Sequence, residues 1–368
     1  MSRAIAPAAS VGFSASSPRG QTLNSFDLLR LLAALAVIYD HGVTLGGHPV
    51  QRFFSTSPAE LGVGGFFVIS GYLVTQSWRR APVLKAFLAR RLLRIEPALV
   101  VSLLVTALVL GAFATTLPLA DYLARPQVWL YVVRNALLYP VTYALPGVFT
   151  HNPLPDQVNG ALWTLRLEFS CYLGVAALGL AGQLSRRTVA GLALLAAAVF
   201  LVLHVLRPEL TADELLRKAD IAALFGFLFL AGAFLAIRDR PIPAWAALIC
   251  APLLLTPLWI LGLPAVVVWL GSRPTIRLPA DISYGLYIYA FPLQQILAGA
   301  GHLSFWASLA ATAPFAIASA LLVERPALKL KPKAAAPQRT ATTSTSAPPN
   351  SATSPTALPS SERASGET

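Results

Sequence analysis

Charge is scarce in this chain of 368 residues. Charged residues make up 12% of it, about half of the roughly 25% found in an average soluble domain. The hydrophobic fraction is 56% and the mean hydropathy is +0.64. Such a composition excludes an ordinary soluble domain, because side chains that avoid water have to be covered by lipid. It predicts an integral membrane protein.

Cysteine is nearly absent too. Cys171 and Cys250 are the two cysteines, and both lie inside apolar runs. They exclude a disulfide framework and offer no metal-ligand spacing, so we expect no metal site. The N-terminus also lacks a short apolar stretch that ends at a small-residue cleavage site. We therefore expect no signal peptide, and we expect the first apolar run to be a transmembrane helix.

Acidic residues are outnumbered by basic ones, 16 to 28, which leaves a net charge of +12. In a soluble protein this excess would suggest a nucleic-acid partner. In a membrane protein the positive-inside rule explains it, because basic residues accumulate in cytoplasmic loops. We therefore expect a lipid bilayer around the chain and no nucleic acid.

Long apolar runs are frequent enough to predict about ten transmembrane helices, since one crossing takes about 20 residues. The runs are 28–46, 61–78, 97–117, 161–182, 188–206, 219–237, 243–256, 257–270, 280–299 and 304–323. The seventh and eighth are short and broken by prolines, so their boundaries stay open.

The segment 129–145 is ambiguous, and the basic loops decide its assignment. The basic cluster at 79–94 is predicted to be cytoplasmic. If 129–145 crossed the membrane, Arg186 and Arg187 would lie outside; if it does not, every basic loop lies inside. The fold class is therefore all-α and polytopic, with both termini cytoplasmic. Residues 118–160 form an external loop, and whether it dips into the membrane stays open.

Three regions divide the chain. Residues 1–23 are expected to be a cytoplasmic N-terminal segment, and 24–330 one membrane domain. Residues 331–368 are expected to be a disordered cytoplasmic tail, because Ala, Pro, Ser and Thr dominate its composition and cannot bury a core.

Ionisable residues inside the predicted spans are costly and by default mark a functional pathway. His41 follows Arg30 by eleven residues, about 16 Å along a helix. Glu168 on the fourth span is expected in a layer comparable to that of His41, where a carboxylate would orient an imidazole that acts as a general base. Two alternatives stay open: an interfacial His41, and a Glu168 that forms a structural ion pair.

Arg91 and Arg94 share one helical face on the cytoplasmic lead-in to the third span. Two guanidinium groups at the membrane surface suit a polyphosphate ligand. The alternative is that they contact lipid head groups or set the orientation of the helix.

Six motifs follow one another in order between residues 24 and 330. They are Asn24-Ser-Phe-Asp-Leu-Leu-Arg30 with His41 after ten intervening residues, Gly65-Phe-Phe-Val-Ile-Ser-Gly-Tyr-Leu73, Arg91-x-x-Arg94 before Pro97, Leu162-Trp-Thr-Leu-x-x-Glu168, Ser283-Tyr284 through Pro292, and Glu324-Arg-Pro326. The set resembles acyltransferase family three, bacterial integral membrane O-acyltransferases that modify sugars and glycans.

The resemblance implies a cytoplasmic acyl-CoA donor, with acetyl-CoA as the expected form, and a transfer of its acyl group to a hydroxyl of an extracytoplasmic sugar, polysaccharide or glycolipid. It implies location in the bacterial inner membrane. It also implies roles for individual residues: Arg30, Arg91 and Arg94 in donor binding, His41 and Glu168 in catalysis, and Ser70, Tyr72 and Trp163 in substrate binding. Whether His41 is a general base or an acyl-carrying nucleophile stays open.

Other functions fit the same helix count. A proton-coupled secondary transporter would also have intramembrane ionisable residues and proline-broken segments, but no inverted repeat is evident. A non-catalytic assembly factor would keep full function without His41.

Overall fold

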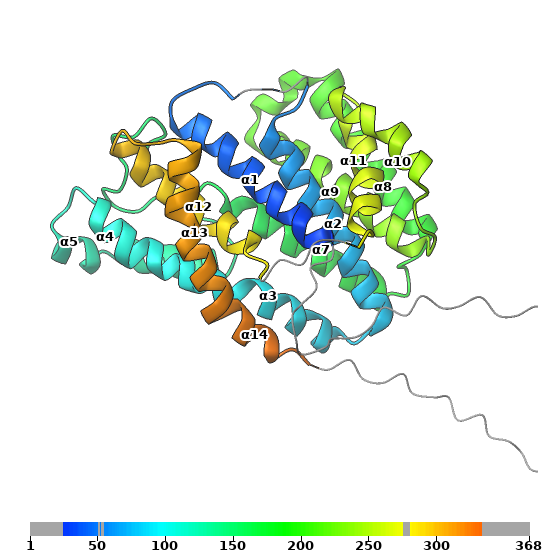
Figure 1. Ribbon diagram of the computed structural model, residues 1–368, viewed down its shortest axis with the longest axis horizontal. Coiled ribbons are helices and arrows are strands. Elements are labelled where there is room, and N and C mark those ends of the chain that lie inside the picture. Colours follow the sequence, from blue (N-terminus) through cyan, green and yellow to red (C-terminus); the bar gives the residue numbers. More distant parts are fainter. Residues whose placement is uncertain (1–24, 51, 53–54, 275–279, 333–368) are drawn as a thin grey trace, which may run out of the picture. The chain divides into compact units, whose positions relative to one another are not determined.

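The computed structural model describes residues 25–50, 52, 55–274 and 280–332 (Figure 1). The N-terminal segment predicted at 1–23 and nearly all of the tail predicted at 331–368 lie outside these residues. In the described part the backbone is helical and contains no strand, only an isolated antiparallel bridge between Thr115 and Val148. The predicted all-α fold class is confirmed.

The helices have the following bounds. They are α1 Ser25–Leu45, α2 Pro58–Arg80, α3 Leu84–Leu104 continued by η1 Val105–Leu110 and α4 Gly111–Ala114, α5 Leu119–Ala124, α6 Pro126–Ala136, α7 Leu162–Leu180, α8 Arg186–Phe200 continued by η2 Leu201–Leu206, η3 Pro208–Ala212, α9 Glu214–Ile237, α10 Ala244–Cys250 continued by η4 Ala251–Leu255, α11 Trp259–Gly271, α12 Ser283–Gly299, and α13 Phe305–Ala318 continued by η5 Ser319–Glu324 and α14 Arg325–Lys329.

Six of the described helices are long and apolar enough to cross a bilayer. They are Ser25–Leu45, Pro58–Arg80, Leu84–Ala114, Arg186–Leu206, Glu214–Ile237 and Phe305–Lys329. Two shorter apolar helices, Ala244–Leu255 and Trp259–Gly271, occupy the proline-broken pair of runs. The chain is a polytopic membrane protein. Each of the ten predicted runs contains a helix, while the count of ten crossings stays a prediction.

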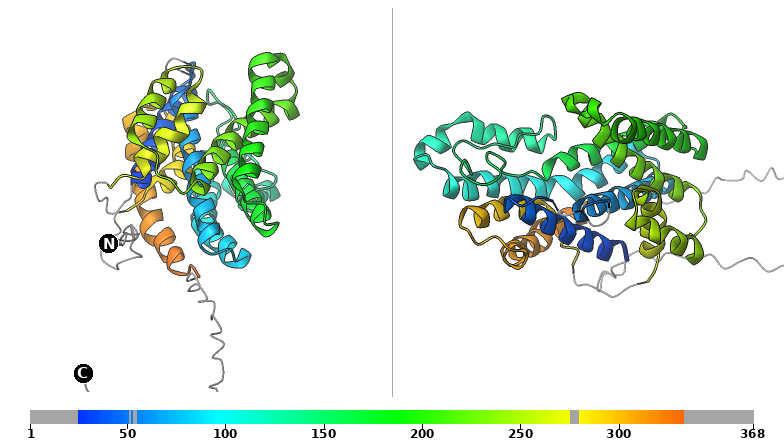
Figure 2. Two further views of the ribbon diagram at one scale, coloured as in Figure 1. Left: turned by 90° about the vertical axis from the view of Figure 1, so that its right-hand side faces the viewer. Right: turned by 90° about the horizontal axis from the view of Figure 1, so that it is seen from above.

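The segment between α3 and α7 does not carry the chain to the other end of the bundle. The ring of Trp78 lies 5.1 Å from that of Phe87, at the start of α3, and Gly179 near the end of α7 also packs against Trp78. Between them, α6 has eleven residues, about 16 Å, which is too short for a crossing. It lies along α3 with Tyr131 fully buried (Figure 2).

Glycines let α2 pack closely against α1 on one side and α9 on the other (Figure 1). A Cβ added at Gly62 would lie 2.7 Å from the carbonyl oxygen of Ala33. One at Gly71 would overlap the carbonyl oxygen of Phe229, and Gly232 meets Val68 in the same way. Backbones approach this closely only where side chains are missing, as is common in membrane helix pairs.

Basic helix ends gather at one end of the bundle. Arg79 at the end of α2 bonds Asp239 after α9, at 2.6 Å and 2.7 Å. Arg186 at the start of α8 donates to the carbonyl oxygen of Arg238 at 2.7 Å. Three basic helix ends that the sequence predicts on one side of the membrane therefore do lie together. Which side that is stays a prediction.

Candidate active site

Arg30 and His41 lie on the same face of α1, because eleven residues make about three helical turns. Ala34 and Val37 lie between them on that face, and both are buried. This face of α1 therefore carries a cation near its start, an apolar middle and an imidazole near its end.

A cavity of about 380 Å³ opens at the Arg30 end of this face. Its walls come from α1, α2, α3, α7, α12 and the segments next to α12 and α14. The polar residues that line it are Asp27, Arg30, Ser70, Arg91, Arg94, Thr164, Glu168, Tyr172, Asp281, Ser283, Tyr284, Tyr287 and Lys331. The predicted donor-binding arginines and Glu168 therefore share one cavity, although they come from three helices.

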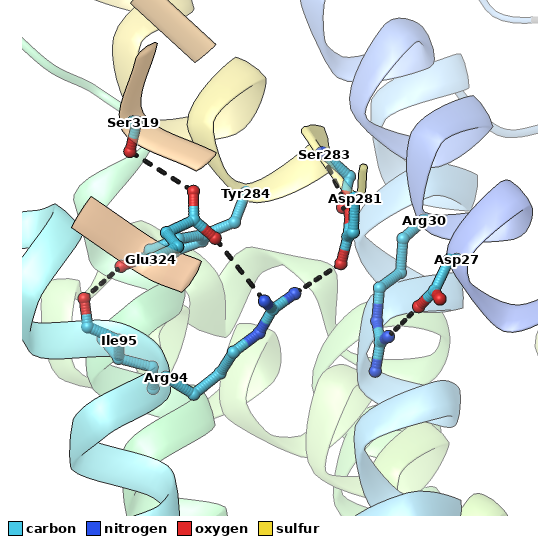
Figure 3. Close-up of polar contacts among 9 residues, drawn as sticks. All are labelled: Asp27, Arg30, Arg94, Ile95, Asp281, Ser283, Tyr284, Ser319 and Glu324. Atoms are coloured by element: carbon cyan, nitrogen blue, oxygen red, sulfur yellow. Dashed lines mark hydrogen bonds and ion pairs between the residues drawn. The ribbon is translucent and has the colours of Figure 1, made fainter. Parts of the chain in front are cut away.

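Arg94 lies between two carboxylates (Figure 3). Its Nη2 is 2.5 Å from Asp281 Oδ2 and its Nη1 is 3.5 Å from Glu324 Oε2. Ser283 bonds the other oxygen of Asp281, and Ser319 donates to Glu324 at 3.2 Å. The network ties α3 to the segment before α12 and to η5. Removing Arg94 would leave two largely buried carboxylates without a cation, whereas removing one carboxylate would leave Arg94 paired with the other.

Arg30 is also paired, at 2.9 Å with Asp27 one turn earlier on α1 (Figure 3). Arg91 differs. Its guanidinium lies over the rings of Phe87 and Tyr172, 5.9 Å from each ring centre. Its Nε is buried without a hydrogen-bond partner in the part of the chain that the structure describes. A buried donor without a partner is costly, so it marks a place where a ligand could bind.

Glu168 projects into the same cavity and accepts hydrogen bonds from the hydroxyls of Ser70 and Tyr172. One turn earlier on α7, the Thr164 hydroxyl lies 2.5 Å from that of Tyr287 on α12. Together these groups form a polar layer that joins α2, α7 and α12.

His41 is not among the described residues that line the cavity. Its ring meets the edge of Phe291, with 5.1 Å between the ring centres. A packed apolar cluster that includes Ala34, Ile38 and Ala290 fills the positions of α1 and α12 between His41 and the cavity. The imidazole therefore lies outside the cavity, on the far side of this apolar cluster.

The expected pairing of His41 with Glu168 requires correction. No hydrogen bond joins them among the described residues, and their levels differ. Gln294 on α12 bonds the carbonyl oxygen of Ile38 at 2.8 Å, whereas Thr164 bonds Tyr287, seven residues earlier on α12. With Glu168 a further turn away, the two side chains are separated by on the order of 20 Å along the helix axes.

The reason is the depth at which α7 begins. The sequence count placed the start of the fourth span at the outer surface and Glu168 about 10 Å below it, in a layer comparable to that of His41. Instead the loop before α7 packs into the bundle: Asn152 bonds Gln295 at 2.6 Å and Asn159 bonds the carbonyl oxygen of Ile288 at 2.9 Å. The helix therefore begins below the level of His41.

The three predicted substrate-binding residues have different surroundings. Ser70 lines the cavity. Tyr72 packs its ring 5.6 Å from Phe26, and Trp163 packs 5.6 Å from Phe225. Neither aromatic ring is among the described lining residues, so both lie in the packing around the site.

Four lining or supporting residues were missed by sequence reasoning: Asp281, Glu324, Tyr172 and Lys331. A signal existed for Glu324, an acidic residue directly after the apolar run 320–323, where charge is costly. Asp281 precedes the aromatic motif at 283–292 by two residues. Lys331 gave no signal, because only the tertiary structure brings it to the cavity.

Comparison with known proteins identifies the family of this chain. The family model described as an acyltransferase domain, of acyltransferase family three, matches residues 23–269. An O-acetyl transferase of Shigella phage Sf6 is 29% identical over 309 residues, which cover 78% of this chain and 89% of that protein. Nodulation protein 10 of Rhizobium leguminosarum bv. viciae is 28% identical over 366 residues, 84% and 94% of the two chains.

No solved structure matches this chain. The family match nevertheless spans more than half of its length and contains the α1, α2, α3 and α7 residues that build the cavity. This chain therefore belongs to acyltransferase family three, and it is a membrane O-acyltransferase.

Proposed function

We propose that this enzyme moves an acetyl group from a cytoplasmic acyl-CoA to a hydroxyl of an extracytoplasmic sugar, polysaccharide or glycolipid. The observation that carries the proposal is the cavity beneath His41. Four cations line it, and one of them, Arg30, lies on the same face of α1 as the imidazole of His41. A donor with an anionic head and a long reactive arm matches that arrangement.

The chemistry of the cavity fits the donor. Phosphate groups need cationic donors, and Arg91 presents a guanidinium whose Nε has no protein partner among the described residues. When bound, acyl-CoA supplies an acyl group activated as a thioester. Arg91 would hold the phosphates, and the apolar side chains Val63, Phe66 and Phe67 further along would exclude water from the arm.

His41 is proposed to act on the acceptor hydroxyl, as a general base or as the nucleophile that carries the acyl group. An imidazole can accept a proton from a hydroxyl or carry an acyl group on its nitrogen. Glu168 is proposed as a positioning residue, because it holds the Ser70 and Tyr172 hydroxyls in the cavity and does not reach His41. Transfer would then require the apolar cluster between the cavity and His41 to open.

The sidedness of the proposal rests on charge. Arg79, Arg186 and Arg238 meet at the cavity end of the bundle, and clustered basic residues favour the cytoplasm. His41 would then lie towards the external face, where an acceptor could enter near loop 118–160. The phage relative is an O-acetyl transferase, which supports acetyl as the acyl group.

The test is a reconstitution of the purified protein in lipid nanodiscs with radiolabelled acetyl-CoA and a panel of glycan acceptors. We expect free CoA and labelled acceptor to form together, in equal amounts. A proton-coupled transporter would form neither. Binding of acetyl-CoA without acceptor-dependent CoA release by any acceptor of the panel would contradict the proposed sugar or glycan acceptor.

A further inference from the structure

Four cations line the cavity: Arg30, Arg91, Arg94 and Lys331. Two of them already have carboxylate partners, as described above for Arg30 and Arg94. Arg91 and Lys331 have no acidic partner among the residues that the structure describes. Two positive charges that face one cavity without compensation repel each other, and a bound anion would relieve that repulsion.

Lys331 reaches the cavity from the far end of the chain. It lies two residues beyond the end of α14, outside the membrane-spanning segments, and Leu328 on α14 lines the cavity beside it. The neighbouring Lys329 is exposed and does not line the cavity. The turn after α14 therefore directs Lys331, and not Lys329, towards the cavity.

The surroundings of Lys331 disfavour its own charge. Partial burial, together with the positive charges of Arg94, Arg91, Arg90 and Arg30, lowers the pKa of Lys331 to about 8. The carboxylates of Asp27 and Asp281 also line the cavity, but each is engaged by an arginine. An anion that binds beside Lys331 would raise this pKa again, because it stabilises the ammonium form.

We propose that Arg91 and Lys331 together form the anion site of the cavity and bind the phosphates of the donor, while Arg94 is a positioning residue that ties α3 to the segment before α12 and to η5. This inference rests on the proposed function, because that function names the phosphate-bearing ligand as acyl-CoA. It assigns different roles to the two arginines of the Arg91-x-x-Arg94 motif.

The geometry explains the division. A phosphate that bound Arg94 would have to displace Asp281 at 2.5 Å or compete with Glu324 for the same guanidinium. A phosphate that binds Arg91 displaces no acidic partner, and it satisfies an Nε that is otherwise without a hydrogen bond in the described part of the chain. Lys331 adds a compact ammonium, which can donate hydrogen bonds to a phosphate in many directions.

The experiment measures CoA binding by the purified full-length protein in nanodiscs of neutral lipid. We expect Lys331→Gln and Arg91→Gln each to weaken CoA binding about tenfold or more, the loss expected for one charge-assisted contact. Binding of pantetheine, which lacks the nucleotide and its phosphates, should be unchanged in Lys331→Gln. Lys329→Gln is the matched control and should bind CoA like the wild type.

A pH series gives a second readout. Wild-type affinity for CoA should fall as the pH rises above about 8, by up to about tenfold per pH unit, because a proton must then be taken up on binding. Lys331→Arg should bind tightly with little change up to pH 9.5, since a guanidinium stays charged. Thermal unfolding of each variant checks that the fold is retained.

The outcomes separate the two proposals. If wild-type protein binds CoA and Lys331→Gln binds it equally well, the anion site is wrong while the donor stands. If the wild type binds no CoA, the acyl-CoA donor fails, and the phosphate site fails with it. If binding is seen only to anionic lipid added to the nanodiscs and depends on Lys331, the site takes a lipid phosphate and the nucleotide assignment is overturned.

Discussion

The two ends of the Arg30–His41 face are built by different interactions. At the Arg30 end, charged groups from α1, α3, η5 and the segment before α12 are paired with each other, and the cavity opens between them (Figure 3). At the His41 end no ion pair joins α1 to another helix among the described residues. His41 packs edge-to-face with Phe291, an amide of Gln294 bonds the backbone of α1, and the neighbouring carboxylate of Asp40 accepts a hydrogen bond from Ser57 at 2.8 Å.

The difference shows how the molecule separates two tasks. Under the proposed function, ion pairs would hold the helices in place around a donor that is itself charged. No ion pair among the described residues holds the His41 imidazole, so it is available to a substrate that reaches it. We expect changes at the two ends to have distinct consequences.

The largest effect should follow His41→Ala. Acyl transfer should fall about 10²–10⁴-fold, the usual contribution of a positioned acid–base group. CoA binding and the thermal unfolding midpoint should stay unchanged, because His41 lies outside the cavity. Transfer rates and CoA affinities are measured in nanodiscs, together with the thermal unfolding midpoint. The exposed His302→Ala is the control, and a variant at position 41 with normal transfer would remove the imidazole from the mechanism.

Breaking the charge network should come next. Arg94→Leu is expected to lower the free energy of unfolding by about 3 kcal/mol, because it leaves the carboxylates of Asp281 and Glu324 without a cation. Asp281→Asn should cost less, because Arg94 keeps Glu324 as a partner. The double variant should lose less than the sum, since the two residues share one interaction. Thermal unfolding in detergent measures this cycle. Simple additivity would show that Arg94 and Asp281 are not coupled.

A substitution at the His41 end should cost less stability. Gln294→Leu removes the bond to the carbonyl oxygen of Ile38 and one to Ser308 at 3.2 Å. We expect destabilisation of about 1–3 kcal/mol, typical of a buried acceptor that loses its donor. The exposed Gln127→Leu is the control. If Gln294→Leu cost more than Arg94→Leu, the contrast between the two ends would be wrong.

The smallest effect is expected from Arg79→Ala. The Arg79 and Asp239 side chains are 38% and 61% exposed, and exposed ion pairs contribute about 0–1 kcal/mol. The unfolding midpoint of Arg79→Ala should lie slightly below that of the wild type, and added salt should not raise it. A loss as large as that of Arg94→Leu would mean that exposure does not distinguish the two pairs.

Much of the fold could be predicted from the sequence. Hydropathy and the basic loops predicted the helical class, the helices in all ten runs and a segment 118–160 that returns the chain to the same end. They succeed because lipid penalises each buried charge and each unpaired backbone group, so the constraint acts locally along the chain. The family resemblance grouped Arg30, Arg91 and Arg94, and all three line one cavity.

The depth of Glu168 and the ionic partners of the arginines could not be predicted from the sequence. The sequence placed Glu168 level with His41, but the 137–161 loop sinks into the bundle, and α7 begins deeper than a surface count allows. Nothing local distinguishes Arg91 from Arg94 either, since both have the same chemistry and lie on one helical face.

What the sequence by itself determined is a polytopic helical membrane enzyme with cations at one end of α1 and an imidazole at the other. The tertiary structure alone decided which cations are already neutralised: Asp281 and Glu324, both more than 180 positions beyond Arg94, pair with it, and Lys331 turns towards the cavity near Arg91. The physical reason is that ion pairs in a helical bundle form between helices, and their geometry depends on the packing of the whole assembly.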